Sequence, residues 1–230
     1  VRSNFYLYLS NYLNPDFIYN LSLIAENYYF NKDYKKSLKI LKNFNKDDIF
    51  YFWFRKKKEA QIIGKQKNKS ELLNFIASEF NKINNPNNKM IFDLANFYKS
   101  SNDYDNAIKY YSFIIKNLNN NSSIKSDLLY RRGGSYERKG DYINADKDLL
   151  KSLEIDPDDA YVLNYLAYSW LERDYKIEKA IEMLENAYSA RSNDPYIIDS
   201  LGWAYYLTDD FSKAEEYLKR AVELMPDDPI

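Results

Sequence analysis

Few side chains in this sequence could carry out covalent chemistry, and the clearest candidates are Ser122 and Lys125. They stand at the Ser-x-x-Lys spacing in which a lysine takes the proton of an attacking serine in some acyl-transfer enzymes. The surrounding segment is rich in asparagine and has neither a companion motif nor a nearby glycine that could build an oxyanion hole. We therefore interpret it as an insertion between structural elements and expect no catalytic residue there.

Two acidic loops, at residues 156–159 and 227–228, are the candidates for binding a cation. Both lack the alternating carboxylates, the glycine and the distal glutamate of a calcium-binding loop. Aspartate at such places also caps a helix, and the neighbouring prolines end one. We expect helix capping, with no metal and no cofactor.

A basic string, residues 55–58, directly follows the aromatic residues 52–54, and this mixture is found in nucleic-acid-binding patches. The solvent and core faces of one helix would give the same string. With 33 basic and 34 acidic residues, the chain has a formal charge of −1 and lacks the positive field that displaces counterions from a nucleic acid. We therefore predict that nucleic acid is not a partner.

The composition excludes further classes of function. The 230 residues include no cysteine and no histidine, which removes thiolate nucleophiles, imidazole bases and the usual zinc ligands. No stretch approaches the ~18 consecutive apolar residues that a membrane-spanning helix needs. We expect a chain that is not an enzyme by itself and that does not span a membrane.

The elements that must position any site are indicated by a repeat of about 34 residues. The chain has only 5 glycines and 6 prolines, which favours long helices over turn-rich sheets. One column of the repeat is small, and the column three residues later is aromatic in all five copies: Ala25, Ala95, Gly133, Ala167 and Gly202, followed by Tyr28, Tyr98, Tyr136, Trp170 and Tyr205. Spacings of three and four residues place side chains on one helix face.

A second set of columns predicts a second helix in each repeat. It begins with a small residue, and an apolar residue generally follows four positions later: Ser37, Ala107, Ala145, Ala180 and Ala214, then Leu41, Tyr111, Leu149, Leu184 and Leu218. Small residues are needed where two helix axes approach closely. Between the columns, Asn, Gly or Asp can end the first helix, and Asp33, Asp103, Asp141 or Asp210 can cap the next. Each repeat is thus predicted to be two antiparallel helices, about thirteen helices in all, with essentially no strand.

This pattern resembles the tetratricopeptide repeat, in which Leu201, Gly202, Tyr205, Ala214, Leu218, Ala221 and Pro226 match the family spacing. The resemblance implies an all-α, right-handed superhelical solenoid of antiparallel helix pairs. We predict one array over residues 1–230, with residues 1–14 as the second helix of a preceding repeat and further repeats at 18–50, 51–87, 88–125, 126–159, 160–194 and 195–228. Because the chain opens in the middle of the pattern, we expect it to be a fragment of a longer protein.

The repeat at 51–87 is degenerate. Lys58 and Gln61 stand in the small and aromatic columns, although Ser70 and Ala77 keep the seven-residue spacing of the second helix.

Family resemblance also predicts a binding surface, because particular positions of the first helices line the inner groove of such arrays. In the last two repeats these positions hold Tyr161, Asn164, Tyr168, Leu171 and Glu172, then Tyr196, Asp199, Trp203, Tyr206 and Leu207. The predicted partner-binding residues are Tyr161, Asn164, Tyr168, Tyr196, Asp199, Trp203 and Tyr206. The alternative is that a composition rich in tyrosine and asparagine places rings wherever amphipathic residues are tolerated.

Two functions remain open at this point. The first is a non-catalytic scaffold or adaptor that binds protein or peptide partners in its groove, with self-association through exposed terminal repeats as an additional contact. The second is the regulatory repeat region of an enzyme whose catalytic domain lies outside this fragment. The sequence also resembles longer bacterial envelope proteins with many such repeats, some of which tether a carboxyl-terminal processing protease to its substrates. That resemblance favours the bacterial periplasm or envelope, with the cytoplasm next.

Overall fold

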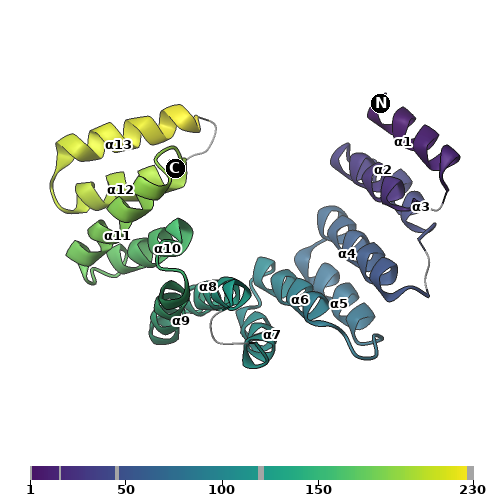
Figure 1. The fold of residues 1–230 in the computed structure, drawn as a ribbon, viewed down its shortest axis with the longest axis horizontal. Coiled ribbons are helices and arrows are strands. Elements are labelled where there is room, and N and C mark those ends of the chain that lie inside the picture. Colours follow the sequence, from purple (N-terminus) through teal and green to yellow (C-terminus); the bar gives the residue numbers. More distant parts are fainter. Residues whose placement is uncertain (1, 16, 45–46, 119–121, 227–230) are drawn as a thin grey trace. The chain divides into compact units, whose positions relative to one another are not determined.

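A computed structural model describes residues 2–15, 17–44, 47–118 and 122–226, and it divides into two compact units, residues 1–103 and 104–230. Each unit is a succession of helices (Figure 1). The boundary between the units falls within the repeat predicted at 88–125. The single array over residues 1–230 therefore stays a prediction.

Thirteen helices and no strand lie within the described residues, as the repeat pattern predicts. Unit 1 contains α1 Arg2–Leu13, α2 Tyr19–Phe30, α3 Tyr34–Leu41, α4 Ile49–Gln66, α5 Lys69–Phe80 and α6 Asn88–Ser100. Unit 2 contains α7 Tyr104–Lys116, α8 Ser123–Arg138, α9 Tyr142–Ile155, α10 Ala160–Leu171, α11 Ile177–Ala190, α12 Pro195–Leu207 and α13 Phe211–Leu224. Neighbouring helices pack in pairs, α2 with α3 and α4 with α5 in unit 1, and α8 with α9, α10 with α11 and α12 with α13 in unit 2.

One turn recurs between the paired helices and explains why they reverse direction. In unit 2 the amide of Asp141 donates to the carbonyl of Tyr136, and the amide of Asp210 donates to the carbonyl of Tyr205. The residues before these aspartates, Gly140 and Asp209, have φ angles of 83° and 60°. This six-to-one bond around a left-handed residue is the Schellman motif that ends a helix.

The same turn recurs in unit 1, where Asp33 and Asp103 donate to the carbonyls of Tyr28 and Tyr98. Caps then start the following helices, because the carboxylates of Asp33, Asp141 and Asp210 accept the backbone N–H three residues later. The residues of the aromatic column therefore supply the backbone carbonyls that accept the hydrogen bond of this turn.

The small columns are buried at the contacts between paired helices, as the sequence predicts. Ala145 and Ala180 have no exposed surface, and Ala214 is 3% exposed. A Cβ atom added to Gly133 would lie 2.9 Å from Cγ of Leu149, so α8 and α9 can approach only because glycine stands there. The predicted column positions therefore hold in the repeats that keep the pattern.

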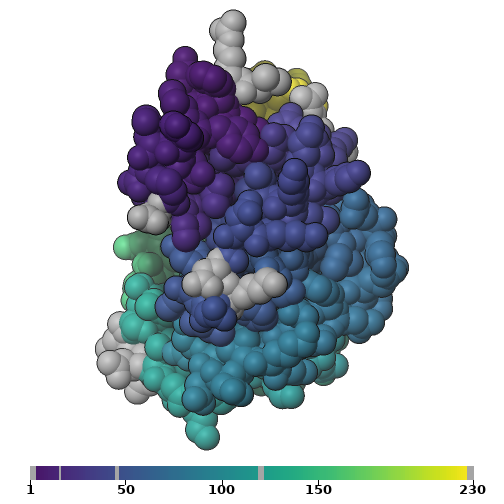
Figure 2. All heavy atoms as spheres, turned by 90° about the vertical axis from the view of Figure 1, so that its right-hand side faces the viewer, coloured from purple at the N-terminus to yellow at the C-terminus, as the bar shows by residue number. Residues whose placement is uncertain are grey.

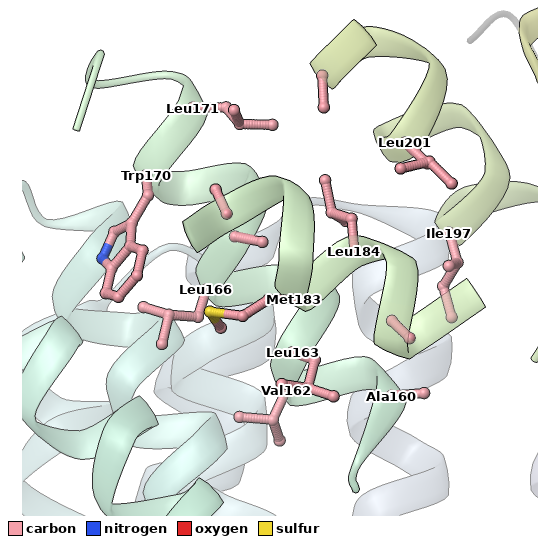
Figure 3. Close-up of a cluster of buried hydrophobic side chains, with 14 of the residues drawn as sticks. Ala160, Val162, Leu163, Leu166, Trp170, Leu171, Met183, Leu184, Ile197 and Leu201 are labelled. Atoms are coloured by element: carbon pink, nitrogen blue, oxygen red, sulfur yellow. The ribbon is translucent and has the colours of Figure 1, made fainter. Parts of the chain in front are cut away.

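The core of unit 2 takes side chains from α9 through α13, and most of them come from α10, α11 and α12 (Figure 3). Leu166 and Trp170 of α10 pack with Leu184 of α11 and Leu201 of α12, and each of these four is at most 1% exposed. Burying such side chains contributes about 1.5–3 kcal/mol each. The first helices of successive repeats are thereby fixed side by side, which sets the positions of the residues on their other face.

The repeat at 51–87 departs from the predicted register. Ser70 is exposed, whereas Ile76 and Phe80 of α5 and Ala60 of α4 are buried, so the prediction that Ser70 occupies a packing column is wrong. The small residue of the first helix is Gly64 and not the residue in the column of Lys58, and a Cβ on Gly64 would lie 2.5 Å from Cδ1 of Leu72. The turn that ends the other first helices is absent, and α4 continues for 18 residues.

Helix α1, purple in Figures 1 and 2, carries several large apolar side chains at the surface of unit 1. Tyr12 is 80% exposed and Leu13 is 74% exposed, and Phe5 and Tyr6 are each more than 60% exposed. Isolated exposed apolar side chains are common on protein surfaces, but four large ones on a single helix of 12 residues are not.

Candidate functional site

Ser122 and Asp159 are helix caps. The Ser122 hydroxyl oxygen accepts the backbone N–H of Lys125 at 3.1 Å and starts α8. Asp159 accepts the N–H groups of Tyr161 and Val162 and starts α10. Asp159 thus caps a helix as predicted, whereas the segment from Ser122 to Lys125 begins α8 and is not the predicted insertion; Asp227 and Asp228 lie outside the described residues.

The basic string at residues 55–58 is neutralised within the protein. Arg55 and Lys56 pair with Glu59, at 3.1 and 3.0 Å, and Lys56 also reaches Glu79. Lys57 pairs with Asp93, and Lys58 pairs with Glu26, at 2.7 and 2.6 Å. These four basic side chains are only 12–24% exposed, so they hold α4 against its neighbours rather than presenting a cationic patch.

Within the described ranges, no group of three or more acidic, cysteine or histidine side chains is placed to hold a metal ion. None of the helices described is long and apolar enough to cross a membrane.

The seven predicted partner-binding residues fall on two helices of unit 2 that contact each other. Tyr161, Asn164 and Tyr168 lie on α10, and Tyr196, Asp199, Trp203 and Tyr206 lie on α12. Their spacings of three and four residues place each set along one side of its helix. We call these seven residues the α10–α12 face.

Four tyrosines make the α10–α12 face aromatic and accessible. Tyr196 is 57% exposed and Tyr168 is 40% exposed, with Tyr161 and Tyr206 between them. The rings of Trp203 and Tyr206 stack at 5.3 Å between centroids and 17° between planes. The guanidinium of Arg191 lies 4.7 Å from the centre of the Tyr161 ring, so that ring already has a cation over it.

Trp203 has a structural contact as well, because its half-buried ring packs against the core of unit 2. Among the other groove positions, Leu171 is buried in that core, whereas Glu172 and Leu207 are exposed. The family positions thus predict most of the exposed side chains of this face. They do not predict Leu171, which is buried in the core instead of lining the face.

The electrostatics of the α10–α12 face centre on Asp199. Burial raises the pKa of the Asp199 carboxyl above its ordinary value of 3.8, and no neighbouring cation opposes the effect. Burial also raises the pKa of the Tyr168 hydroxyl, with further contributions from the carboxylates of Glu172 and Asp199. The Asp199 carboxylate therefore acts on Tyr168 across the contact between α10 and α12, whereas Glu172 acts from the end of α10 itself.

Two polar atoms of this face are buried without a hydrogen-bond partner among the described residues, Oδ1 of Asn164 and Nε1 of Trp203. Most buried polar side-chain atoms in proteins have such a partner, so each exception calls for a reason. The amide and the indole could be satisfied by a ligand only after a small side-chain movement, because neither atom is accessible as it stands.

The two units differ strongly in charge, a feature that the nearly neutral whole chain conceals. Residues 1–103 contain 17 basic and 10 acidic side chains, a formal charge of +7, and residues 104–230 contain 16 and 24, a formal charge of −8. A count over each half of the sequence could have shown this segregation. The α10–α12 face therefore lies in a strongly acidic unit.

Unit 1 has a hollow of its own that the sequence did not indicate. It has a volume of about 350 Å³ and is lined mainly by apolar side chains, among them Phe44, Phe50, Trp53 and Met90. At its rim the Trp53 indole N–H donates to Asp93 at 3.0 Å, and Lys57 pairs with the same carboxylate. The polar groups at this rim are satisfied by one another.

Family models described as tetratricopeptide repeat match three segments, residues 89–112, 126–159 and 195–228. A TPR repeat-containing protein of Pseudomonas aeruginosa, PA4667, is 35% identical over 101 residues, which are 44% of this chain and 17% of that protein. The chain therefore matches less than a fifth of the length of this relative.

Solved structures of low sequence identity share the fold. BtubC from P. vanneervenii is 16% identical with a TM-score of 0.61, and the match covers 98% of this chain and 87% of that one. A MamA fragment from Desulfovibrio magneticus RS-1 is 20% identical with a TM-score of 0.58, covering 77% and 97%. YrrB, described as a TPR protein with an unusual peptide-binding site, is 16% identical with a TM-score of 0.52, covering 80% and 89%.

Repeated turns, buried small columns, matched segments and shared fold agree with one another. The family supports a role as a protein–protein interaction scaffold. The chain carries tetratricopeptide repeats at residues 89–112, 126–159 and 195–228, and the fold of its described residues is an all-α solenoid of helix pairs.

Proposed function

We propose that this protein is a non-catalytic scaffold that binds a peptide segment of a partner protein on the α10–α12 face. The observation that carries the proposal is the row of exposed tyrosines on two adjacent first helices, with the Trp203–Tyr206 stack beside them. Aromatic rings anchor interfaces well because they cover a large area and have few rotamers to freeze.

The binding free energy expected for a peptide follows from the surface area of these rings. An aromatic side chain buries about 150–250 Å², so covering half of two rings contributes about 4–6 kcal/mol at ~25 cal/mol per Å². Association costs remove much of this gain. We therefore expect micromolar affinity for a short peptide, and tighter binding only where a partner contacts more repeats.

The experiment compares alanine variants of exposed rings. Tyr168→Ala and Tyr206→Ala should weaken partner binding by about 1 kcal/mol or more, a factor of about five, while the melting temperature moves by only a few degrees. Phe113→Ala is the matched control, because Phe113 is a comparably exposed ring, at 55%, on the second helix α7. Trp203→Ala is less informative, since that ring also packs on the core.

The partner is captured by crosslinking in cells that express the full-length protein, and the crosslinked residues are then mapped. Crosslinks on α10 and α12, together with weaker capture by the Tyr168 and Tyr206 variants but not by Phe113→Ala, support the proposal. If the two tyrosine variants lose stability but keep their partner, the rings are structural and the composition explanation holds.

A finer form of the proposal is an adaptor in the bacterial envelope that brings a protease to its substrates. Support comes from the resemblance of the repeat order to envelope proteins of that kind and from the similarity to the Pseudomonas protein over 101 residues. Recovery of a protease together with its substrate in the crosslinking experiment would support the adaptor. Loss of an enzymatic activity of the full-length protein in the tyrosine variants would instead favour the regulatory region of an enzyme.

Self-association through terminal repeats is a separate proposal, supported by the exposed apolar side chains of α1. Sedimentation of the chain and of a Tyr12→Ser, Leu13→Ser variant tests it. A concentration-dependent dimer that the variant lacks is the expected result, and a monomer at all concentrations contradicts it.

A further inference from the structure

The carboxylate of Asp199 is unlike the other partly buried acids of this protein. Glu59, Glu79, Asp93, Asp146 and Asp148 are each in a salt bridge, with side chains that are 6–19% exposed. Asp199 has no salt bridge in the described structure, and it is not a helix cap, since Asp194 starts α12. A carboxylate that loses water without gaining a cation is costly to keep, so a structural role does not explain it.

Aromatic faces suited to a cation lie next to this carboxylate. Trp203 follows Asp199 by one helical turn and stacks on Tyr206. Tyr168 lies on α10, which contacts α12, and the charge of Asp199 acts on its hydroxyl. A Lys or Arg side chain over such rings is attracted by the negative faces of their π-systems.

The protein's own cations leave these rings free. Elsewhere in unit 2, Lys213 lies 4.5 Å from the centre of the Tyr205 ring, and Lys176 lies 4.8 Å from that of Trp170. No cation within the described ranges lies in this way over Tyr168, Trp203 or Tyr206. Arg138 lowers the pKa of the Tyr168 hydroxyl, and it acts more strongly on Tyr165, to which it is hydrogen-bonded.

From this arrangement we infer that the partner of the α10–α12 face is a basic peptide segment, whose Lys or Arg side chain sits between the Asp199 carboxylate and the rings of Tyr168 and Trp203. The inference rests on the proposed function and adds the charge of the ligand to it. The formal charge of −8 on unit 2 is complementary to such a segment and would increase its rate of association.

Selection from a phage-displayed library of randomised decapeptides against the whole chain provides the test. Peptides that bind should be enriched in Lys or Arg. In one selected peptide, replacing the basic residue by norleucine keeps the apolar stem and removes the charge. This change should weaken binding about tenfold at low salt, and high salt should reduce the difference.

The double-mutant cycle uses Asp199→Asn. This variant should bind the basic peptide about tenfold more weakly than the parent, and it should bind the norleucine peptide equally well. Glu182→Gln is the matched control, since it removes one negative charge from an exposed side chain of α11 and should leave both affinities unchanged.

Three outcomes distinguish failure of the inference from failure of the proposed function. Peptides that need Tyr168 and Tyr206 but show no basic preference refute the inference and leave the proposed function in place. Equal affinity losses for both peptides in Asp199→Asn also refute the inference. Peptides that bind regardless of the Tyr168 and Tyr206 variants, or a library that yields none, refute the proposed function as well.

Discussion

Replacing Gly202 by alanine tests the close packing of α12 on α13, because the added methyl group has no room. A Cβ atom there would lie 2.8 Å from Cγ and 2.9 Å from Cδ2 of Leu218, and 3.1 Å from the Leu218 backbone nitrogen. Rotation of the Leu218 side chain cannot relieve the contact with the backbone. The two helices must therefore move apart for the variant to fold.

The net effect is the difference between two terms. Alanine in place of glycine inside a helix contributes about 0.8–1 kcal/mol of stability. Overpacking costs about 1–3 kcal/mol. We expect Gly202→Ala to lower the free energy of unfolding by about 1 kcal/mol, or about 2–4 °C in melting temperature for a chain of this size.

Gly64→Ala is the matched comparison. Its Cβ would meet only the tip of a side chain, Cδ1 of Leu72, at 2.5 Å, with the next atoms at 3.6 Å and beyond. A rotamer change of Leu72 costs about 0.5–1.5 kcal/mol, close to what the helix gains, so this variant should be within about 0.5 kcal/mol of the parent.

Urea denaturation gives the free energy of unfolding of the two variants and the parent, and hydrogen exchange shows which helices are destabilised. Faster exchange in Gly202→Ala should be confined to α12 and α13, because repeat stability is carried by contacts between neighbours. The packing argument is refuted if Gly202→Ala is as stable as the parent, or if Gly64→Ala is the more damaging change.

Four further predictions concern stability. Ala180→Leu should cost about 1–3 kcal/mol in urea denaturation, since Ala180 has no exposed surface at the contact of α10 with α11. Arg132→Gln should cost about 3–5 kcal/mol, because Arg132 bonds both oxygens of the buried Asp148, at 2.6 and 2.7 Å, and the variant leaves that charge unpaired; an unchanged midpoint would contradict this. Asp209→Gly should raise the melting temperature, because the left-handed φ of 60° costs a non-glycine residue about 1 kcal/mol. Asp199→Asn should be more stable than the parent at neutral pH: burial raises the pKa of the native carboxyl, so the parent loses stability as pH rises from the unfolded value near 3.8 through the native one. The melting temperatures of the parent and of Asp199→Asn should coincide in stronger acid. A difference between them that narrows as pH rises would contradict the prediction.

Helix pairing was predictable from the sequence because the physical requirements of a repeat recur at fixed positions. The column of Tyr28, Tyr98, Tyr136, Trp170 and Tyr205 marks the last turn of each first helix, whose carbonyl accepts the bond that ends the helix. Small residues such as Ala145 and Ala180 must stand where two axes approach, whatever the partner. Local turn chemistry and close packing are short-range, so one sequence shows them.

The exposed rings of the α10–α12 face were predictable for the same reason, since a helix that buries one side must present the other. Tyr161, Tyr168, Tyr196 and Tyr206 are exposed as the family positions indicate. The assignment of these residues to partner binding stays a prediction, because exposure says which side chains are accessible and not what covers them.

Only the tertiary structure decided the features that depend on residues far apart in the chain. The register of 51–87 differs from the expected one because the small residue that packs on a leucine of the second helix is Gly64, against Leu72, and not the residue in the column of Lys58. The basic string at 55–58 became a set of ion pairs because Glu26, Glu79 and Asp93 come from three other helices. Asp199 differs from the other buried acids for the same physical reason. Whether a charge is satisfied depends on which distant side chains folding brings within about 4 Å of it, and the packing of helices alone determines that.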